Sequence, residues 1–231
     1  MNPSDKISSD LLSKRLGNLF EDPVQPVQRP QVLAPGAVLL RGFAQEFSGS
    51  LLQAVQQVTA QAPFRHLITP GGLRMSVAMS NCGALGWVSD RDGYRYNRFD
   101  PDSGAPWPAM PPCFVALARS AAQSAGFDGF EPDACLINRY APCTRLSLHQ
   151  DKDERSDAHP IVSVSLGLPA VFLWGGARRA DAVQRVALVH GDVVVWGGPA
   201  RLHFHGVLPV PQGHHTLTGA HRINLTFRKA G

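Results

Sequence analysis

The sequence of 231 residues lacks the features that mark several specialised classes of protein. No stretch approaches the ~20 consecutive apolar residues that cross a bilayer, and residues 1–30 contain no apolar run of the kind found in a secretory signal. The four cysteines form no CxxC pair, so the sequence predicts neither a zinc ribbon nor a disulfide framework. These absences favour a soluble, cytoplasmic protein with free thiols and no membrane partner.

Charged residues are few, at 17% of the chain against 44% hydrophobic residues, a balance that supports a large buried core. The formal net charge of +4 lies outside residues 1–35, because basic and acidic residues cancel there. Of the 22 basic residues 18 are arginine, whose planar guanidinium suits phosphates, carboxylates and stacked bases. The charge pattern therefore favours an anionic partner.

Proline is frequent in residues 1–35, which we expect to be a partly disordered leader. A single domain is expected at 36–231, because neither a repeat nor a second linker follows. Helical periodicity is found at 47–60 and 112–125. The remainder consists of short segments typical of strands: 74–79, 135–140, 145–149, 161–166, 170–174, 184–189, 192–196 and 222–227. Many short strands with two flanking helices predict a mainly β (α+β) fold of sandwich, jelly-roll or barrel type.

Residues 222–228 follow a strict period of two, with polar residues at the even positions and apolar residues at the odd ones. The polar set shares one face of the predicted strand: Arg222, Asn224, Thr226 and Arg228. The same spacing of two polar residues occurs at 138–140, 149–151 and 203–205. A barrel lined in this way binds a polar ligand or a metal ion.

A metal site is suggested by His149 and Asp151, which lie two residues apart, together with His205 from a different strand. Two histidines and one carboxylate leave coordination positions open, as Fe(II) oxygenases require for a co-substrate and dioxygen. His-x-Asp arises by chance about 0.5 times in this composition, so a surface turn is the competing interpretation. His203 competes with His205 as the third ligand. We expect the histidines without a nearby partner to be solvated: His190, His214, His215 and His221.

Arg222 and Arg228 supply a second constraint, because six residues along a strand place their backbones about 20 Å apart. Side chains that lean toward each other leave a gap suited to a small dicarboxylate. Each guanidinium would hold one carboxylate, or a metal would share one end. Asn138 and Tyr140 are candidates to complete the site from a neighbouring strand. The competing interpretation is that either arginine pairs with an acidic residue on the surface.

Several segments resemble the AlkB family of Fe(II)- and 2-oxoglutarate-dependent dioxygenases: NRYAPCTRLSLHQDKDE, PIVSVSLGLPAVF, HGDVVVWGG, RLHFHGV and RINLTFRKAG. The resemblance covers nearly everything after residue 36, including TPGGLRMSVAMSNCGALGW and DPDSGAPWPAMP. It implies a double-stranded β-helix, or jelly-roll, core with flanking helices and a nucleotide-recognition lid. It also implies a catalytic set made of the iron ligands His149, Asp151 and His205 and of Arg228. The implied 2-oxoglutarate contacts are Arg222, which binds the distal carboxylate, and Asn138, Tyr140, Asn224 and Arg228, the last on the keto-acid side.

The reaction that the resemblance implies is direct-reversal DNA repair by oxidative dealkylation. An N-alkyl carbon of 1-methyladenine or 3-methylcytosine would be hydroxylated with dioxygen and released as formaldehyde, while 2-oxoglutarate is decarboxylated to succinate and CO2. Etheno adducts are a further implied substrate. The expected partner of the monomeric enzyme is alkylated single-stranded DNA, with duplex DNA and RNA as additional candidates.

Substrate contacts are also implied by the matching motifs. The segment GWVSDRDGYRY is similar to the family's lid and contains Trp87, Tyr94 and Tyr96, whose rings can stack on a flipped-out base. Asp153 is implied to face the exocyclic amine, where a carboxylate favours a cationic methylated base over a neutral one. Packing of these aromatic residues in the core is the competing interpretation. Further implied contacts are Arg179 at the pocket rim, Met79 and Thr69.

Three positions depart from the family pattern: Trp174 replaces Phe, Ile223 replaces Tyr, and His203 replaces an aromatic residue. We expect Trp174 to narrow the base pocket and the departures to alter substrate range without changing the reaction type. Two other functions fit parts of the sequence pattern. One is a 2-oxoglutarate hydroxylase that acts on proteins or small molecules, and the other is a catalytically silent jelly-roll module that binds single-stranded nucleic acid.

Overall fold

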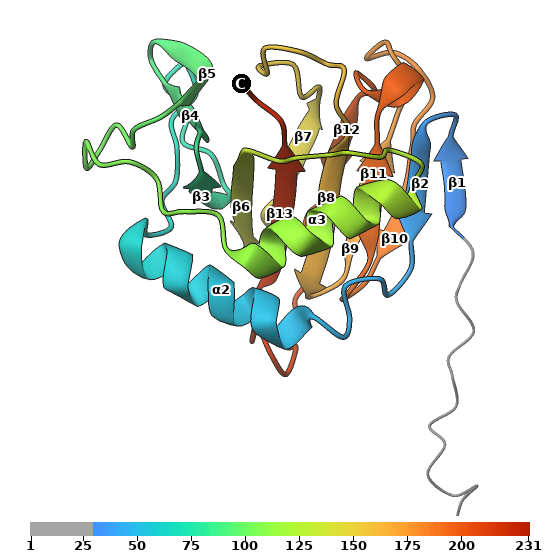
Figure 1. Ribbon diagram of the computed structural model, residues 1–231, viewed down its shortest axis with the longest axis horizontal. Helices are drawn as coiled ribbons and strands as arrows, with labels where there is room; N and C mark the ends of the chain where they lie inside the picture. The colour runs from blue at the N-terminus through green and yellow to red at the C-terminus, as the bar shows by residue number, and fades with distance from the viewer. Residues whose placement is uncertain (1–29) are drawn as a thin grey trace, which may run out of the picture.

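Two antiparallel sheets form the framework of residues 30–231, the part of the chain that the computed structural model describes (Figure 1). The larger sheet runs in the order β1 (Gln31–Ala34), β2 (Ala37–Leu40), β11 (Val193–Trp196), β8 (Ile161–Gly167), β13 (Arg222–Arg228), β6 (Ala134–Tyr140) and β3 (Ala78–Gly83). The smaller sheet runs in the order β10 (Gln184–Leu188), β9 (Ala170–Trp174), β12 (His205–Val207) and β7 (Leu146–His149). This arrangement is the jelly-roll fold that the resemblance implies.

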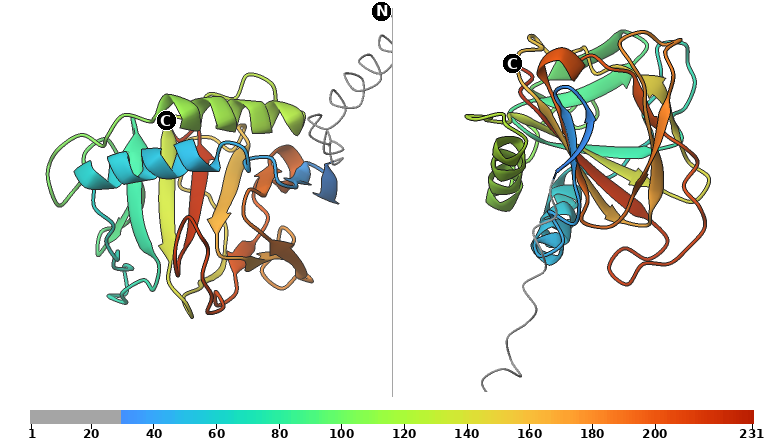
Figure 2. Two further views of the ribbon diagram at one scale, coloured as in Figure 1. Left: turned by 90° about the horizontal axis from the view of Figure 1, so that it is seen from below. Right: turned by 90° about the vertical axis from the view of Figure 1, so that its right-hand side faces the viewer.

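Two helices, α2 (Ser48–Gln61) and α3 (Pro112–Ser124), lie along one face of the larger sheet (Figure 2). Their buried residues recur at helical spacing, for example Leu51, Val55 and Val58 on α2, which gives each helix one apolar face. On α3, the ring of Phe114 packs edge-on against Phe227 of β13, with ring centroids 5.7 Å apart. Both helices therefore form where the sequence predicts them, within one residue at each end.

Strand β13 lies between β8 and β6 and separates the helix-covered core from the interior of the jelly roll. Its odd-numbered residues, among them Leu225 and Phe227, belong to the core beneath the helices. The even-numbered ones are the polar wall predicted from the sequence and are all buried: Arg222, Asn224, Thr226 and Arg228. Ile223 belongs to the helix-covered core, so that departure from the family pattern lies behind the wall.

A small hairpin of β4 (Gly86–Asp90) and β5 (Gly93–Asn97) stands beside the end of the larger sheet (Figure 1). Its register places Trp87 opposite Tyr96. Gly93, the first residue after the turn, has φ 121°, a backbone conformation that L side chains rarely adopt. The hairpin occupies the segment that the resemblance identifies as the lid, and we call residues 86–97 the lid hairpin.

Two expectations about the N-terminal half need correction. The strand predicted at 74–79 lies at Ala78–Gly83 instead, because buried Ser80 and Asn81 are tolerated there by hydrogen bonds to the carbonyl groups of Ala62 and Trp87. Strand β1 lies inside the predicted leader and pairs with β2, so ordered structure begins by Gln31. Residues 1–29 of the predicted leader lie outside the described residues. Within residues 30–231, no helix is both long and apolar enough to cross a membrane.

Candidate active site

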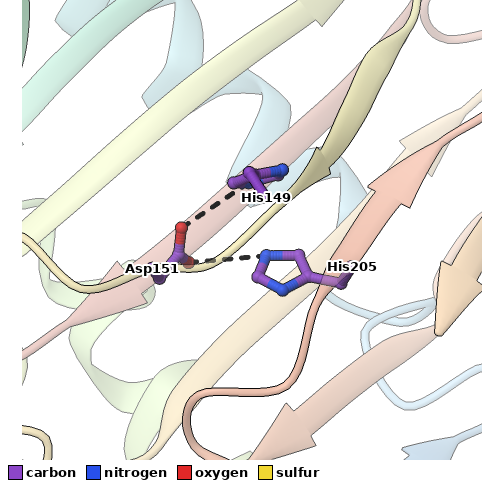
Figure 3. A group of neighbouring side chains, drawn as sticks. All are labelled: His149, Asp151 and His205. Atoms are coloured by element: carbon purple, nitrogen blue, oxygen red, sulfur yellow. Dashed lines mark ion pairs between the residues drawn. The ribbon is translucent and has the colours of Figure 1, made fainter. Parts of the chain in front are cut away.

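Two histidines and one aspartate converge at the edge of the smaller sheet (Figure 3). His149 is the last residue of β7, and His205, the first residue of β12, is its direct partner in the antiparallel pairing. Asp151 follows β7 by two residues, with Oδ1 3.6 Å from Nε2 of His149 and Oδ2 3.7 Å from Nε2 of His205. All three ligating atoms lie within 4.8 Å of one another, a separation that one metal ion can bridge.

The backbone fixes which nitrogen of each histidine is available to a metal. Nδ1 of His149 lies 2.8 Å from the carbonyl oxygen of Ser147, and Nδ1 of His205 lies 3.0 Å from that of His203. Because a carbonyl only accepts, each Nδ1 carries the proton and each Nε2 presents a lone pair toward the aspartate. His203 therefore contributes its backbone carbonyl to this arrangement, and its side chain lies outside the cluster.

The electrostatics of the cluster favour a divalent cation. Burial lowers the pKa of His205 to about 4, aided by the neighbouring His149, so His205 is neutral at pH 7. Burial opposes ionisation of Asp151, but the charge of Arg228 and the two histidines outweigh it and hold the pKa of this carboxyl below its usual range. Two imidazoles and one carboxylate are a ligand set suited to Fe(II).

A cavity of about 760 Å³ opens in front of this cluster, between the two sheets and the lid hairpin. It brings together every site residue nominated from the sequence: Thr69, Met79, Trp87, Tyr94, Tyr96, Asn138, Tyr140, His149, Asp151, Asp153, Arg179, His205, Arg222, Asn224 and Arg228. The cavity is also lined by Phe172 and Trp196, which the sequence analysis did not nominate. The arrangement excludes a surface turn as the setting of His149 and Asp151.

Arg222 is a fully buried cation whose hydrogen bonds are incomplete. Its guanidinium lies 4.9 Å from the ring centroid of Tyr140, and Nη2 donates to Ser165 Oγ at 3.0 Å. Within residues 30–231, no group accepts a hydrogen bond from its Nε or Nη1, and the buried Oδ1 of Asn138 receives none. Burial lowers the pKa of Arg222, and an unpaired buried charge is costly. The unpaired donors suit a carboxylate that enters the cavity.

Arg228 makes different contacts from Arg222. Its Nε and Nη2 donate to Oδ2 of Asp151 at 3.1 and 2.6 Å, and Nε also lies 3.2 Å from Oε1 of Glu154. Arg201 supports the same segment, because its Nη1 donates to the backbone carbonyl of Asp151 at 2.7 Å. Glu154 and Arg201 were missed by the sequence analysis, although HQDKDE and RLHFHGV contain them, because buried ion pairs between distant segments leave no periodic signal.

Lid residues are tied to the acidic segment that follows the cluster. Trp87 stacks on Tyr94, with ring centroids 5.6 Å apart and planes inclined by 11°. Its indole Nε1 donates to Asp153 Oδ2 at 2.8 Å, and the hydroxyl of Tyr96 donates to Glu154 Oε1 at 3.0 Å. Burial raises the pKa of Tyr96, which keeps its hydroxyl protonated. All three aromatic side chains border the cavity, and Trp87 also packs against the hydrophobic core beside it, so the two interpretations are not exclusive.

Two expectations about aromatic residues need correction. Trp174 is absent from the described residues that line the cavity. It packs beneath the cavity wall against Trp196 at 5.9 Å and His203 at 5.4 Å, so it does not narrow the pocket directly. His190 and His215, expected to be solvated without a partner, stack on each other at 4.4 Å.

Comparisons with known proteins agree with this fold and site. Residues 36–228 match the family model of the 2OG-Fe(II) oxygenase superfamily. The chain is 58% identical over 213 residues to the alpha-ketoglutarate-dependent dioxygenase AlkB of Salmonella typhimurium, covering 92% of this chain and 97% of that protein. It is 31% identical over 235 residues to the DNA N(6)-methyladenine demethylase ALKBH1D of Arabidopsis thaliana, covering 89% and 52% of the two chains. The solved structure of OsALKBH1 superimposes with a TM-score of 0.77 at 31% identity, covering 87% and 99%.

The fold and the comparisons define the class of protein first: this is an Fe(II)- and 2-oxoglutarate-dependent dioxygenase, which uses dioxygen as its other co-substrate. Within that superfamily, the chain belongs to the AlkB family. The residues present fit both reagents. The histidine–aspartate cluster offers the ligand types that Fe(II) prefers, and the unpaired donors of Arg222 match a carboxylate of 2-oxoglutarate.

Proposed function

We propose that the protein repairs DNA by oxidative removal of alkyl groups from 1-methyladenine and 3-methylcytosine. The observation that carries the proposal is a single cavity that combines three kinds of group. These are a two-histidine, one-carboxylate cluster, a buried guanidinium with unpaired donors, and a pair of stacked aromatic rings beside a carboxylate. The similarity of the chain to the DNA N(6)-methyladenine demethylase ALKBH1D supports a nucleic-acid substrate.

In this proposal His149, Asp151 and His205 hold Fe(II), and Arg222 holds the distal carboxylate of 2-oxoglutarate. Asn138 and Tyr140 complete the co-substrate site, together with Asn224. When bound, the iron with 2-oxoglutarate and dioxygen supplies the oxidation of the N-alkyl carbon, with succinate, CO2 and formaldehyde as products. Asn224 acts mainly as a brace, because its Nδ2 donates to Ser163 Oγ and to the carbonyl of Val164, both at 2.9 Å.

Arg228 orients Asp151, the carboxylate that would hold the metal. Its two donors occupy Oδ2 of Asp151, which leaves Oδ1 as the oxygen directed toward His149. Because Arg228 is paired with carboxylates of the protein, the two-arginine alternative in which each guanidinium holds one end of a dicarboxylate is disfavoured. The alternative in which the metal shares one end fits the observed pairing better.

The lid side of the cavity is suited to a flipped-out cationic base. Stacking on an aromatic ring contributes about 1–3 kcal/mol per base, and Trp87 is already held parallel to Tyr94. Asp153 is fixed by the indole of Trp87 and supplies the negative charge that favours a methylated, cationic ring. Arg179 is exposed at the cavity rim, and Met79 and Thr69 contribute to its walls.

The finer features of the proposal concern the partner and the setting. We infer a monomer that acts in the cytoplasm on alkylated single-stranded DNA, with duplex DNA, RNA and etheno adducts as further substrates. A single strand supports the proposal because its bases reach the cavity without being unpaired first.

Substitution of Asp153 tests the nucleic-acid proposal. Asp153→Asn should lower kcat/KM for a strand carrying 1-methyladenine about tenfold or more, because the charge that favours the cationic base is removed. Asp157→Asn, at an exposed position outside the cavity lining, is the matched control and should leave kcat/KM unchanged. Equal activity of the two variants, or full activity of Trp87→Ala, would instead favour a hydroxylase that acts on proteins or small molecules.

A further inference from the structure

Glu154 lies at the centre of a buried charge network that the proposed reaction does not use. Its side chain is only 3% exposed. Oε1 lies 3.2 Å from Nε of Arg228, and Oε2 lies 3.0 Å from Nη2 of Arg201, whose side chain is equally buried. Glu154 is therefore held between two arginines that come from different segments of the chain.

Both arginines also contact the aspartate of the metal cluster. Arg228 donates to the Asp151 carboxylate, and Arg201 donates to the Asp151 backbone carbonyl. The remaining Arg201 donor, Nε, reaches the carbonyl of His159 at 2.9 Å, so this guanidinium is fixed on three sides. A shift of Glu154 would disturb both arginines, and through them both the side chain and the backbone of Asp151.

Glu154 also contacts the lid hairpin. The hydroxyl of Tyr96 donates to Oε1, the same oxygen that faces Arg228. One residue earlier, Asp153 accepts the indole N–H of Trp87, the cross-strand partner of Tyr96. Two neighbouring lid side chains are thus docked on two consecutive residues just beyond the metal cluster.

The buried charges of this network restrict how far its side chains can move. Asp151 and Glu154 carry two negative charges and Arg201 and Arg228 carry two positive ones, all with side chains at most 10% exposed. Buried ions tolerate little displacement, because the loss of a partner leaves a desolvated charge uncompensated. A cation bound beside Asp151 therefore acts on the same set of contacts that holds the lid.

We propose that Glu154 is a positioning residue that couples the lid hairpin to the metal cluster. Metal binding stabilises the orientation of Asp151, Arg228 and Glu154 in which Tyr96 docks, and docking of the lid strengthens metal binding by the same factor. The inference rests on the metal site of the proposed function. It assigns Tyr96 a role in metal affinity that stacking on a base would not give it.

The test is titration of the metal-free protein with Mn(II), a redox-stable substitute for Fe(II), by calorimetry. Tyr96→Phe removes the hydroxyl that contacts Glu154 and keeps the ring, and it should weaken Mn(II) binding about fivefold. Glu154→Gln should weaken it about 10- to 100-fold. Tyr94→Phe is the matched control on the same hairpin, because within residues 30–231 no hydrogen bond involves the Tyr94 hydroxyl, and its Mn(II) affinity should be unchanged.

Hydrogen exchange of the lid amides, residues 86–97, gives a second readout. Mn(II) should slow exchange of these amides in the wild-type protein and in Tyr94→Phe, and it should not slow it in Tyr96→Phe at saturating Mn(II). Equal Mn(II) affinity of the two Tyr→Phe variants, with metal-dependent protection in both, would overturn the coupling and leave the proposed function intact. Failure of the wild-type protein to bind Mn(II) would overturn both. If Glu154→Gln does not fold, the two Tyr→Phe variants still decide the outcome.

Discussion

At the scale of single residues, the buried arginines differ in whether their donors have hydrogen-bond acceptors in the protein. Arg201 and Arg228 are buried and paired with carboxylates, whereas Arg222 is equally buried and keeps Nε and Nη1 without an acceptor in residues 30–231. A buried cation with unpaired donors is costly, and a carboxylate ligand would compensate for that cost. The unpaired guanidinium is therefore the residue-level feature on which the proposed 2-oxoglutarate site rests.

Arg222→Lys should raise the KM for 2-oxoglutarate about 10- to 100-fold, because an ammonium cannot reproduce the planar, charge-assisted hydrogen bonds of the guanidinium. Initial rates of succinate release at increasing 2-oxoglutarate concentration measure the effect. Arg185→Lys, at an exposed position on β10, is the control and should keep the KM of the wild-type protein. An unchanged KM in Arg222→Lys would show that another group holds the distal carboxylate.

His190 makes part of the stability dependent on pH. Its Nδ1 accepts the backbone N–H of Gly167, and burial, together with His215, lowers its pKa below the usual value of 6.5. The unfolded chain therefore binds a proton at a higher pH than the folded protein does. The resulting contribution to stability is complete above pH 6.5 and is lost as the pH falls toward the lowered pKa.

His190→Asn keeps an acceptor for Gly167 and removes the titration. The fall in Tm between pH 7 and pH 5, followed by circular dichroism, should be smaller in this variant than in the wild-type protein. Because the comparison uses the difference between variants, the contributions of histidines that do not contact His190 cancel, and the measured difference belongs to His190 together with its stacking partner His215. An equal fall in both proteins would show that His190 does not contribute to the acid sensitivity.

At the scale of secondary-structure elements, the lid hairpin depends on close packing of Gly86 against the indole of Trp107. A side chain at Gly86, the first residue of β4, would collide with the indole of Trp107. That indole is buried and donates from Nε1 to the carbonyl of Asn97, the last residue of β5, at 2.9 Å. Trp107 thus joins the ends of both lid strands.

Gly86→Ala should lower the free energy of unfolding by about 1–3 kcal/mol, because the added methyl group displaces a packed indole. Urea denaturation followed by fluorescence measures the loss. Gly71→Ala is the matched control, since a methyl group there would meet only Thr69 Oγ1 at 4.0 Å. The same urea midpoint in the two variants would contradict the role of Gly86.

The sequence predicts most clearly those elements in which the periodicity of apolar residues marks one buried face. Strand β13 and helices α2 and α3 each have one apolar face, and their periodicity identifies them. Strands β4 and β5 were not predicted, because GWVSD and GYRYN are polar and rich in turn-forming residues. Strand β12 has three residues, too few for any period. These strands are stabilised by pairing and by tertiary contacts that local sequence does not encode.

The residues of the site also divide into those that the sequence predicts and those that it does not. His149, Asp151 and His205 could be nominated from spacing and from the resemblance, since the two histidines lie at strand ends and Asp151 lies two residues beyond one of them. Glu154 and Arg201 could not be nominated, because they lie 47 positions apart in the sequence and their importance comes from the buried ion pair between them. Likewise the position of Trp174 behind the cavity wall depends on packing against Trp196.

At the scale of the whole molecule, positive charge is placed where a nucleic-acid strand would approach. The cavity lining includes exposed cations from four segments: Arg74, Arg145, Lys152 and Arg179. Contact with phosphates releases condensed counterions, so oligonucleotide affinity should fall as salt rises, with a slope of about −0.7 per contact for a single strand. Fluorescence anisotropy of a labelled oligonucleotide, measured over about a sixfold range of salt concentration, gives the slope.

Arg145→Glu should make that slope shallower by about 0.7, because one phosphate contact is lost. Arg185→Glu, which makes the same charge change outside the cavity lining, should leave the slope unaltered. A slope of zero in the wild-type protein would mean that phosphates are not contacted.

In the proposed reaction, iron, 2-oxoglutarate and an alkylated base meet in one cavity. The most direct measurement is the yield of succinate and formaldehyde from the purified protein supplied with Fe(II), ascorbate, 2-oxoglutarate and a short single strand that carries one 1-methyladenine. We expect release of formaldehyde equal to the methyl groups removed, accompanied by succinate, and no formaldehyde from an unmethylated strand. Equal succinate from both strands without formaldehyde would contradict it, because the co-substrate would then be consumed without action on the base.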